Sequence, residues 1–280
     1  MLDLVHSLGT AAIRVTDLGS SHGWTLHRAL LEDGREVFVK AAPDHAKVIA
    51  AEAAGLRWLA AARAVPVPDV LAARDGVLVL PWLEGEVPTA EAAERFGRDL
   101  AALHLAGAPE YGAPWAGYIA ELPLDNTHTL DWATFYGERR LLPYLQQAAD
   151  RGRLGPAEVR LVETVIGRLA ELAGPPEPPS RIHGDLWSGN LLWSGGRVHL
   201  IDPAAHGGHR ETDLAMLEWF GAPHLDRMLA AYTETAPLAE GRRDRIALHQ
   251  LHPLLVHVVL FGGSYRESLV AAARQSLRAA

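Results

Sequence analysis

Short apolar runs separated by turn signals predict a small antiparallel sheet near the start of the chain. Residues 25–31 and 36–40 flank the segment Glu32-Asp33-Gly34-Arg35, and an Asp-Gly pair is typical of a tight hairpin turn. Residues 77–80 form another short apolar run with the length of a buried strand. Between them, residues 45–62 carry apolar side chains at helical spacing. We therefore predict strands around one helix.

The pattern after about residue 85 is mainly helical. Helices are predicted over residues 90–105, 130–149 and 156–172, where apolar positions recur every three or four residues. A proline-rich break over residues 174–179 then leads to two short apolar runs, at 191–193 and 198–201. These runs flank Ser194-Gly195-Gly196-Arg197, whose glycines tolerate positive φ, so a second hairpin is predicted.

The second hairpin is flanked by residues that suit phosphoryl transfer. Residues 183–190 read His-Gly-Asp-Leu-Trp-Ser-Gly-Asn, which places Asp185 five positions before Asn190, and Asp202 follows the second strand. Strand pairing would bring Asn190 and Asp202 together as oxygen ligands for magnesium, while Asp185 can accept a proton from a hydroxyl. Each aspartate alone is more often a cap or turn residue. The joint pattern indicates a phosphotransferase.

A lysine and a glutamate in the N-terminal part supply a candidate ATP site. Lys40 ends the strand over residues 36–40 and is predicted to hold the α and β phosphates. Lys40 and Lys47 are the only lysines among 26 basic residues, which hints that a compact ammonium is needed at position 40. Glu52 on the following helix is expected to pair with Lys40, the alternative being a solvated glutamate on an amphipathic helix.

Two further segments are candidates for nucleotide contacts. Residues 18–23, Leu-Gly-Ser-Ser-His-Gly, are predicted to form a loop over the phosphates, because Gly19, Gly23 and the serines let backbone amides approach anions. This is also an ordinary loop composition. After the strand at 77–80, Pro81, Trp82 and Leu83 form a predicted hinge, where adenine would accept from the Leu83 amide and donate to the Pro81 carbonyl.

Composition narrows the class of protein. A net charge of -8 over 280 residues argues against a general nucleic-acid binder. The chain has no cysteine, which excludes disulfides and suits a reducing cytosol. Neither a signal-peptide pattern nor an apolar run approaching the ~18 residues of a membrane span is present. We expect a soluble cytoplasmic protein without nucleic-acid or membrane partners; the sequence does not indicate its oligomeric state.

The chain resembles the fructosamine kinase (ketosamine-3-kinase) family, relatives of aminoglycoside and choline kinases within the protein-kinase-like fold. Trp187 and the Gly-His-Arg-Glu run at 208–211 are the most discriminating residues. The segment at 18–23 departs from the family pattern, which more often has a paired glycine there. The resemblance covers nearly the whole chain, through residues 38–40, 52–56, 183–190, 202–204, 208–216, 251–257 and 260–265.

The resemblance implies an α+β fold with two lobes. Residues 1–80 would form a small antiparallel-sheet lobe that binds nucleotide, residues 81–84 a hinge, and residues 85–280 a larger, mainly helical lobe with the catalytic and substrate-binding residues. Asp213 is expected to accept amide hydrogens from the catalytic loop. His206, His209 and Glu211 could suggest a metal cluster, but a family already served by magnesium gives little reason for zinc.

The implied activity is the Mg²⁺-dependent transfer of the γ phosphate of ATP to the 3-hydroxyl of a ketosamine, a fructosamine or a ribulosamine. The acceptor would be a small ketoamine or a glycated protein, and decay of the product would free the amine. Trp187 and Glu211 are the candidate substrate-binding residues, although packing behind the catalytic loop is an equal alternative for Trp187. The sugar and the amine stay open.

Two other functions are compatible with these residues. An aminoglycoside or other small-alcohol phosphotransferase would share the fold, because fold does not fix substrate. A nucleotide-binding module without turnover belongs to a different class. Against that module stands the complete set of Lys40, Glu52, Asp185, Asn190 and Asp202, at least one of which a non-catalytic relative would be expected to lack.

Overall fold

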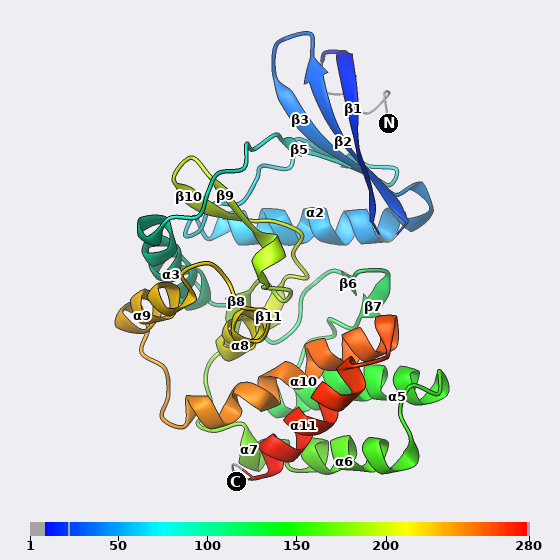
Figure 1. The fold of residues 1–280 in the computed structure, drawn as a ribbon, viewed down its shortest axis with the longest axis vertical. Coiled ribbons are helices and arrows are strands. Elements are labelled where there is room, and N and C mark those ends of the chain that lie inside the picture. The colour runs from blue at the N-terminus through cyan, green and yellow to red at the C-terminus, as the bar shows by residue number, and fades with distance from the viewer. Residues whose placement is uncertain (1–8, 22, 279–280) are drawn as a thin grey trace.

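The N-terminal part of the chain folds into a five-stranded antiparallel sheet above one long helix (Figure 1). The computed structural model describes residues 9–21 and 23–278. The strand order is β1-β2-β3-β5-β4, with bounds β1 Ala12–Ser21, β2 Trp24–Leu31, β3 Glu36–Ala41, β4 Ala72–Arg74 and β5 Val77–Pro81. A 3₁₀ turn at Pro43–His45 leads into helix α2, Ala46–Ala61.

The register of the sheet places Lys40 at its centre. In β3, Lys40 lies opposite Leu26 of β2 and Leu78 of β5. Apolar side chains on this face, including Leu78 and Leu80, pack on Ile49 and Leu56 of α2. Because burial of these side chains fixes which face of β3 points inward, Lys40 is carried into the interior beside the helix.

The remainder of the chain is mainly helical (Figure 1). Its largest apolar cluster joins α5, α6, α10 and α11, and a second cluster joins α3 and α9 to the hairpin over residues 191–200. The helices are α3 Ala90–Leu105, α4 Trp132–Thr134, a π-helix Phe135–Leu141, α5 Leu142–Asp150, α6 Pro156–Gly167, α7 Leu169–Leu172, α8 Arg210–Phe220, α9 Leu225–Thr235, α10 Arg242–Phe261 and α11 Tyr265–Arg278.

Three two-stranded sheets complete this part. Two of them lie within residues 180–208, which are called the catalytic segment below. Gly195 and Gly196 join β9 to β10 with φ of 59° and 66°, as the two-residue turn requires. A 3₁₀ turn at Ser188–Asn190 precedes β9. The sheets are β6 Gly117–Ile119 with β7 Leu122–Leu124, β8 Ser180–Ile182 with β11 His206–Gly208, and β9 Leu191–Ser194 with β10 Arg197–Leu200.

Helix α2 packs directly on the catalytic segment. A Cβ on Gly55 would lie 3.3 Å from that of Ala205, so glycine allows the close approach. One turn further along α2, Arg181 stacks its guanidinium 4.5 Å from the ring centre of Trp58 and donates to the Trp58 carbonyl at 2.6 Å. These contacts fix the helix that carries Glu52 relative to the loop that carries Asp185.

The structure differs from the sequence expectations in three places. The helix predicted over 130–149 contains the π-helix, which directs Arg140 into the core to bond the Asp125 carbonyl and Asn126. The helix predicted over 156–172 breaks at Arg168. The predicted loop at 18–23 is mostly strand, because β1 extends to Ser21 and a register shift at Gly19 absorbs its φ of 100°.

Over the described ranges 9–21 and 23–278, the helices lack the combination of length and apolar character that a bilayer span requires.

Candidate active site

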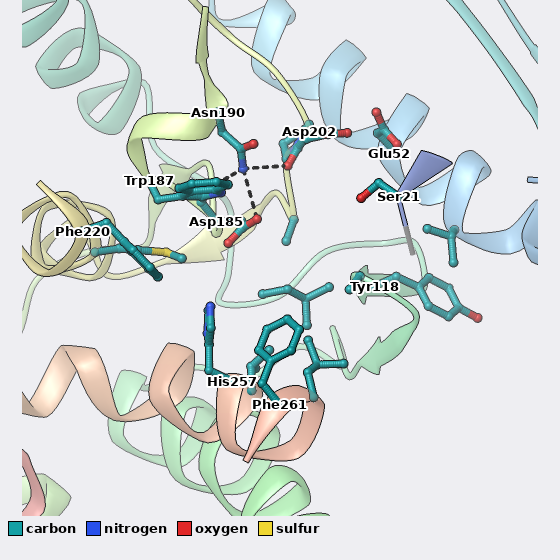
Figure 2. Close-up of a pocket in the computed structure, with 18 of the residues that line it drawn as sticks. Ser21, Glu52, Tyr118, Asp185, Trp187, Asn190, Asp202, Phe220, His257 and Phe261 are labelled. Carbon is teal, nitrogen blue, oxygen red and sulfur yellow. Dashed lines mark hydrogen bonds between the residues drawn. The ribbon is translucent and has the colours of Figure 1, made fainter. Parts of the chain in front are cut away.

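A cavity of about 450 Å³ lies between the sheet with α2, the catalytic segment and the end of α10. Figure 2 shows Asp185, Asn190 and Asp202 gathered on one side of this cavity, His257 and Phe261 on the other, and Phe220 beside Trp187 between the two sides. Lys40 and Glu52 also line it. The structure therefore brings together five of the residues singled out in the sequence.

Asp185 is positioned by a tight turn and by Asn190. The preceding Gly184 has φ of 80°, and a Cβ there would lie 2.3 Å from the Ala204 carbonyl oxygen, which excludes larger residues. The side-chain amide of Asn190 donates to the Asp185 backbone carbonyl at 2.8 Å and to the Asp185 carboxylate at 3.1 Å. Burial, with the charge of Asp202, raises the pKa of Asp185 to about 7. Such a carboxyl suits general-base work near neutral pH.

Asn190 directly precedes β9 and Asp202 lies two residues after β10, so both lie at the open end of the hairpin, as predicted. The Ile201 amide donates to the Asn190 carbonyl at 3.2 Å, and the Asn190 side-chain amide reaches the Asp202 carbonyl at 3.5 Å. Half of the Asp202 side chain is exposed, and its φ of 50° places it in the left-handed region. The Asn190 side-chain nitrogen is used within the protein, so its side-chain oxygen and the half-exposed Asp202 carboxylate, which also meets Lys40, form a donor set that fits a hard divalent cation.

The ion pair expected between Lys40 and Glu52 is present. The Lys40 ammonium lies 2.8 Å from Glu52 and 2.5 Å from Asp202, and the side chains of Lys40 and Glu52 are 5% and 7% exposed. Burial alone would lower the pKa of Lys40, but the two carboxylates outweigh burial and raise it. Burial and the charge of Asp202 raise the pKa of Glu52. The ammonium thus stays charged between two acidic groups.

Asp213 supports the catalytic loop, residues 183–190, as expected from the family resemblance. Its carboxylate accepts from the amides of His183 at 2.7 Å and Gly184 at 2.9 Å. His104 lies 3.2 Å from the same carboxylate. The His183 ring in turn accepts from the Asp185 amide at 3.2 Å and donates to the Ile201 carbonyl at 2.9 Å, which links the loop to the strand before Asp202.

The hinge residues lie at the end of β5, outside the lining of this cavity. The Trp82 amide donates to the Glu36 carbonyl at 2.9 Å. Since backbone groups alternate in direction along a strand, the Pro81 carbonyl faces away from β3. Leu83 follows the end of β5, so the adenine contact expected of its amide stays a prediction.

The segment predicted to cover the phosphates is only partly available to them. The Gly19 amide is bonded to the Asp17 carboxylate at 2.8 Å, and Gly19 does not line the cavity. Gly23, with φ of 85°, belongs to the turn between β1 and β2, and Ser21 reaches the cavity. His22 lies outside the described residues. The structure therefore leaves fewer backbone amides for phosphate than a six-residue loop would offer.

Trp187 and Glu211 have different surroundings. Trp187 lines the cavity, is 38% exposed and lies 5.6 Å from Phe220 between ring centres. Glu211 is 2% exposed and does not reach the cavity, because both of its oxygens accept from Arg245, at 2.6 and 3.0 Å. Glu211, His209 and His249 present ligand atoms within 4.8 Å of one another, but the Arg245 guanidinium occupies the carboxylate.

Several residues that line the cavity were not among the site residues predicted from the sequence. Phe220 ends α8, His257 and Phe261 lie on the last turns of α10, and Tyr265 begins α11. His257, Phe261 and Tyr265 fall in segments that carry the family resemblance, but aromatic residues on amphipathic helices usually pack in a core, so no role in the cavity was predicted for them. Trp24, at the start of β2, also lines the cavity and was not predicted, because aromatic residues are common on half-buried strands.

Comparisons with known proteins agree with this geometry. The family model for fructosamine kinase matches residues 3–279. The protein named Probable ketoamine kinase in Synechocystis sp. is 36% identical over 235 residues, covering 81% of this chain and 78% of that protein. The Thermus thermophilus protein of the same name is 35% identical over 250 residues, covering 89% of each chain.

Solved structures give the same relationship. A candidate fructosamine-3-kinase from Thermobifida fusca superimposes with a TM-score of 0.95 at 55% identity and 99% coverage of both chains. A macrolide 2'-phosphotransferase from Brachybacterium faecium, at 20% identity and a TM-score of 0.64 over 97% of this chain and 96% of that one, shares the fold alone. Such neighbours confirm the expected protein-kinase-like architecture, an antiparallel-sheet lobe followed by a helical region. The chain belongs to the fructosamine kinase family.

Proposed function

We propose that this protein is an ATP-dependent kinase that phosphorylates the 3-hydroxyl of ketosamines. The observation that carries the proposal is the single cavity in which the Lys40–Glu52 pair faces Asp185, Asn190 and Asp202. Membership of the fructosamine kinase family and similarity to relatives named ketoamine kinases supply the acceptor class.

The nucleotide would enter from the hinge. Adenine would accept from the Leu83 amide and donate to the Pro81 carbonyl, and Lys40 would hold the α and β phosphates. Asn190 and Asp202 would hold Mg²⁺, which supplies neutralisation of the charge on the phosphate oxygens. With Asp202 engaged as a metal ligand, Glu52 would still hold the Lys40 ammonium in place.

Asp185 acts on the acceptor. Its carboxylate orients the 3-hydroxyl and takes the proton as the bond from that oxygen to the γ phosphorus forms and the bond from this phosphorus to the β–γ bridging oxygen breaks. ADP leaves, and the ketoamine carries the phosphate. Decay of the 3-phosphate would then free the amine, which makes deglycation of small amines or proteins the role of the reaction. Trp187 would stack on the acceptor.

The charge distribution favours a ketoamine over an aminoglycoside. Among the described residues that line the cavity, the carboxylates are Glu52, Asp185 and Asp202, all on the side of the Lys40 ammonium. The opposite wall is aromatic and apolar (Figure 2). An acceptor with several ammonium groups would find no carboxylate partners along that wall, whereas a ketoamine brings one amine and a neutral sugar chain.

An ADP-release screen tests the proposal. Purified protein with ATP and Mg²⁺ is given ribulosyl-lysine, fructosyl-lysine, an aminoglycoside or choline, and we expect the ketoamines to drive ADP release. Asp185→Asn serves as the control; it should still bind ATP but lose about 10² to 10⁴ in rate, because the amide cannot take the proton. ADP release with aminoglycoside or choline alone would refute the ketosamine assignment, and the absence of ADP release with every acceptor would favour a nucleotide-binding module without turnover.

A further inference from the structure

Trp24 lies against the ammonium of Lys40. The β1–β2 turn pairs Ser21 with Trp24, and further along β2 Leu26 lies opposite Lys40. Because side chains two apart on a strand share a face, Trp24 is the diagonal cross-strand neighbour of Lys40, within reach of a large ring. The Lys40 nitrogen lies 5.0 Å from the centre of the Trp24 ring, and Trp24 is 6% exposed.

The ring is held in place by its neighbours. His45, directly before α2, meets Trp24 edge-on, with 6.3 Å between ring centres and an angle of 86° between their planes. Trp24 also packs in the cluster that includes Ile49 and Leu80. Because these neighbours belong to the protein, they hold the buried ring in place before any ligand binds.

Binding of a metal ion would affect the three contacts of the Lys40 ammonium, with Glu52, Asp202 and the Trp24 ring, in different ways. Glu52 is buried and Asp202 is half exposed to the cavity. A metal ion would take the Asp202 carboxylate away from Lys40, so Glu52 and the Trp24 ring would remain to hold the ammonium. A cation over an aromatic face is attracted most strongly where water is excluded, as it is here.

We propose that Trp24 is a positioning residue for nucleotide binding, which fixes the Lys40 ammonium by a cation–π contact so that it meets the phosphates. The inference rests on the proposed role of Lys40 in holding the α and β phosphates. It assigns to a side chain part of the work expected of the phosphate loop, whose Gly19 amide is already bonded to Asp17.

The test varies the electrostatics of the ring without changing its packing. Tryptophans with increasing fluorine substitution are incorporated at position 24 alone, and the dissociation constant of Mg·ATP is measured by calorimetry without acceptor. Fluorine withdraws charge from the π face, so affinity should fall stepwise. Trp24→Leu should lose the whole contact, roughly 2- to 30-fold, and Trp24→Phe should retain part of it. KM for ATP should rise more than kcat falls.

Trp132→Leu is the matched control, because Trp132 on α4 is also buried, at 7% exposure, but does not line the cavity. Its affinity for Mg·ATP should be unchanged. Equal affinity across the fluorinated series, or equal losses in the two leucine variants, would overturn the role of Trp24. If the unaltered protein bound no Mg·ATP, the proposed function would fail together with this inference, whereas lack of ketoamine turnover would leave the inference standing.

Discussion

At the scale of single residues, burial and repulsion between carboxylates determine the acid–base behaviour of the site. Asp185, Glu52 and Asp202 share a pocket with one ammonium, so the cluster carries more negative than positive charge. Burial and Asp202 raise the pKa of Asp185 to about 7, while burial is outweighed at Asp202 by Lys40, which lowers its pKa. The surroundings thus give Asp185 a pKa that suits a general base, and they favour the ionised form of Asp202, the candidate metal ligand.

The raised pKa of Asp185 predicts a pH-dependent rate. A general base must be deprotonated, so kcat/KM for ATP should fall as pH drops through about 7, and by up to tenfold for each further pH unit. Initial rates between about pH 5.5 and about pH 8.5 check this, with a pH-stability series to exclude unfolding. A flat profile over that interval would remove Asp185 from the role of base.

Lys40→Arg tests the shape of the cation. A planar guanidinium is too large to take the place of an ammonium between Glu52, Asp202 and the Trp24 ring. We expect nucleotide affinity to fall roughly 10- to 100-fold, as for loss of a hydrogen bond to a charged group, with the fold intact. Calorimetry with Mg·ATP and a circular-dichroism melt measure both. Unaltered kinetics would mean that Lys40 does not touch the phosphates.

At the scale of elements, the local signals in the sequence predicted well and the non-local ones did not. Hairpins β2–β3 and β9–β10 follow from Asp-Gly and Gly-Gly turns between apolar runs, and α3 begins and ends where its periodicity does. Strand β1 was not predicted: residues 13–16 alternate apolar and polar side chains, but the strand is exposed along most of its length, so no buried face marks it. The pairing of β8 with β11 joins residues far apart in sequence, so no window of residues reveals it.

The site shows the same division. Asp185, Asn190 and Asp202 could be predicted because one hairpin brings them together. Phe220, His257 and Tyr265 could not, because three helices contribute them and their spacing matches ordinary core positions. Glu211 was a candidate through the family resemblance of the Gly-His-Arg-Glu run, but it is paired with Arg245, which has no local signal, and does not line the cavity.

The support of the catalytic loop by α8 leads to a prediction for Asp213→Asn. The amide offers one acceptor where two backbone amides and His104 need them, so a buried donor loses its partner. We expect stability to fall by about 1–3 kcal/mol and kcat to fall more than ATP affinity. Urea unfolding and steady-state kinetics measure these, with Asp226→Asn on the exposed start of α9 as the control. Equal behaviour of the two variants would argue against loop support.

At the scale of the whole molecule, the C-terminal region holds many histidines in the neutral form. Burial lowers the pKa of each of them below the usual 6.5, well below it for the first three named here: His206, His209, His252, His183 and His249. The rings of His209, His249 and His252 pack with Trp132, Tyr136 and Tyr144 rather than with carboxylates alone. Acid must therefore protonate these side chains preferentially in the unfolded state.

This predicts that the protein loses stability in mild acid. Below the ordinary histidine pKa the unfolded chain binds protons that the folded chain does not, so the free energy of unfolding falls as pH decreases, by about 1.4 kcal/mol per pH unit for each extra proton. Asp185 and Glu52, with raised pKa, act in the opposite direction but are fewer. Urea unfolding at about pH 7.5 and about pH 5.5 compares the two states. Equal or greater stability at the lower pH would contradict the account.

The central claim is that the cavity directs the γ phosphate of ATP to the 3-hydroxyl of a ketoamine. Phosphorus NMR with mass spectrometry on ribulosyl-lysine or fructosyl-lysine, incubated with the protein, ATP and Mg²⁺, tests it most directly. The account predicts one added phosphate, coupled to the proton on carbon 3, followed by slow return of unmodified lysine. Phosphate on another hydroxyl, or an unchanged ketoamine beside a phosphorylated aminoglycoside, would contradict it.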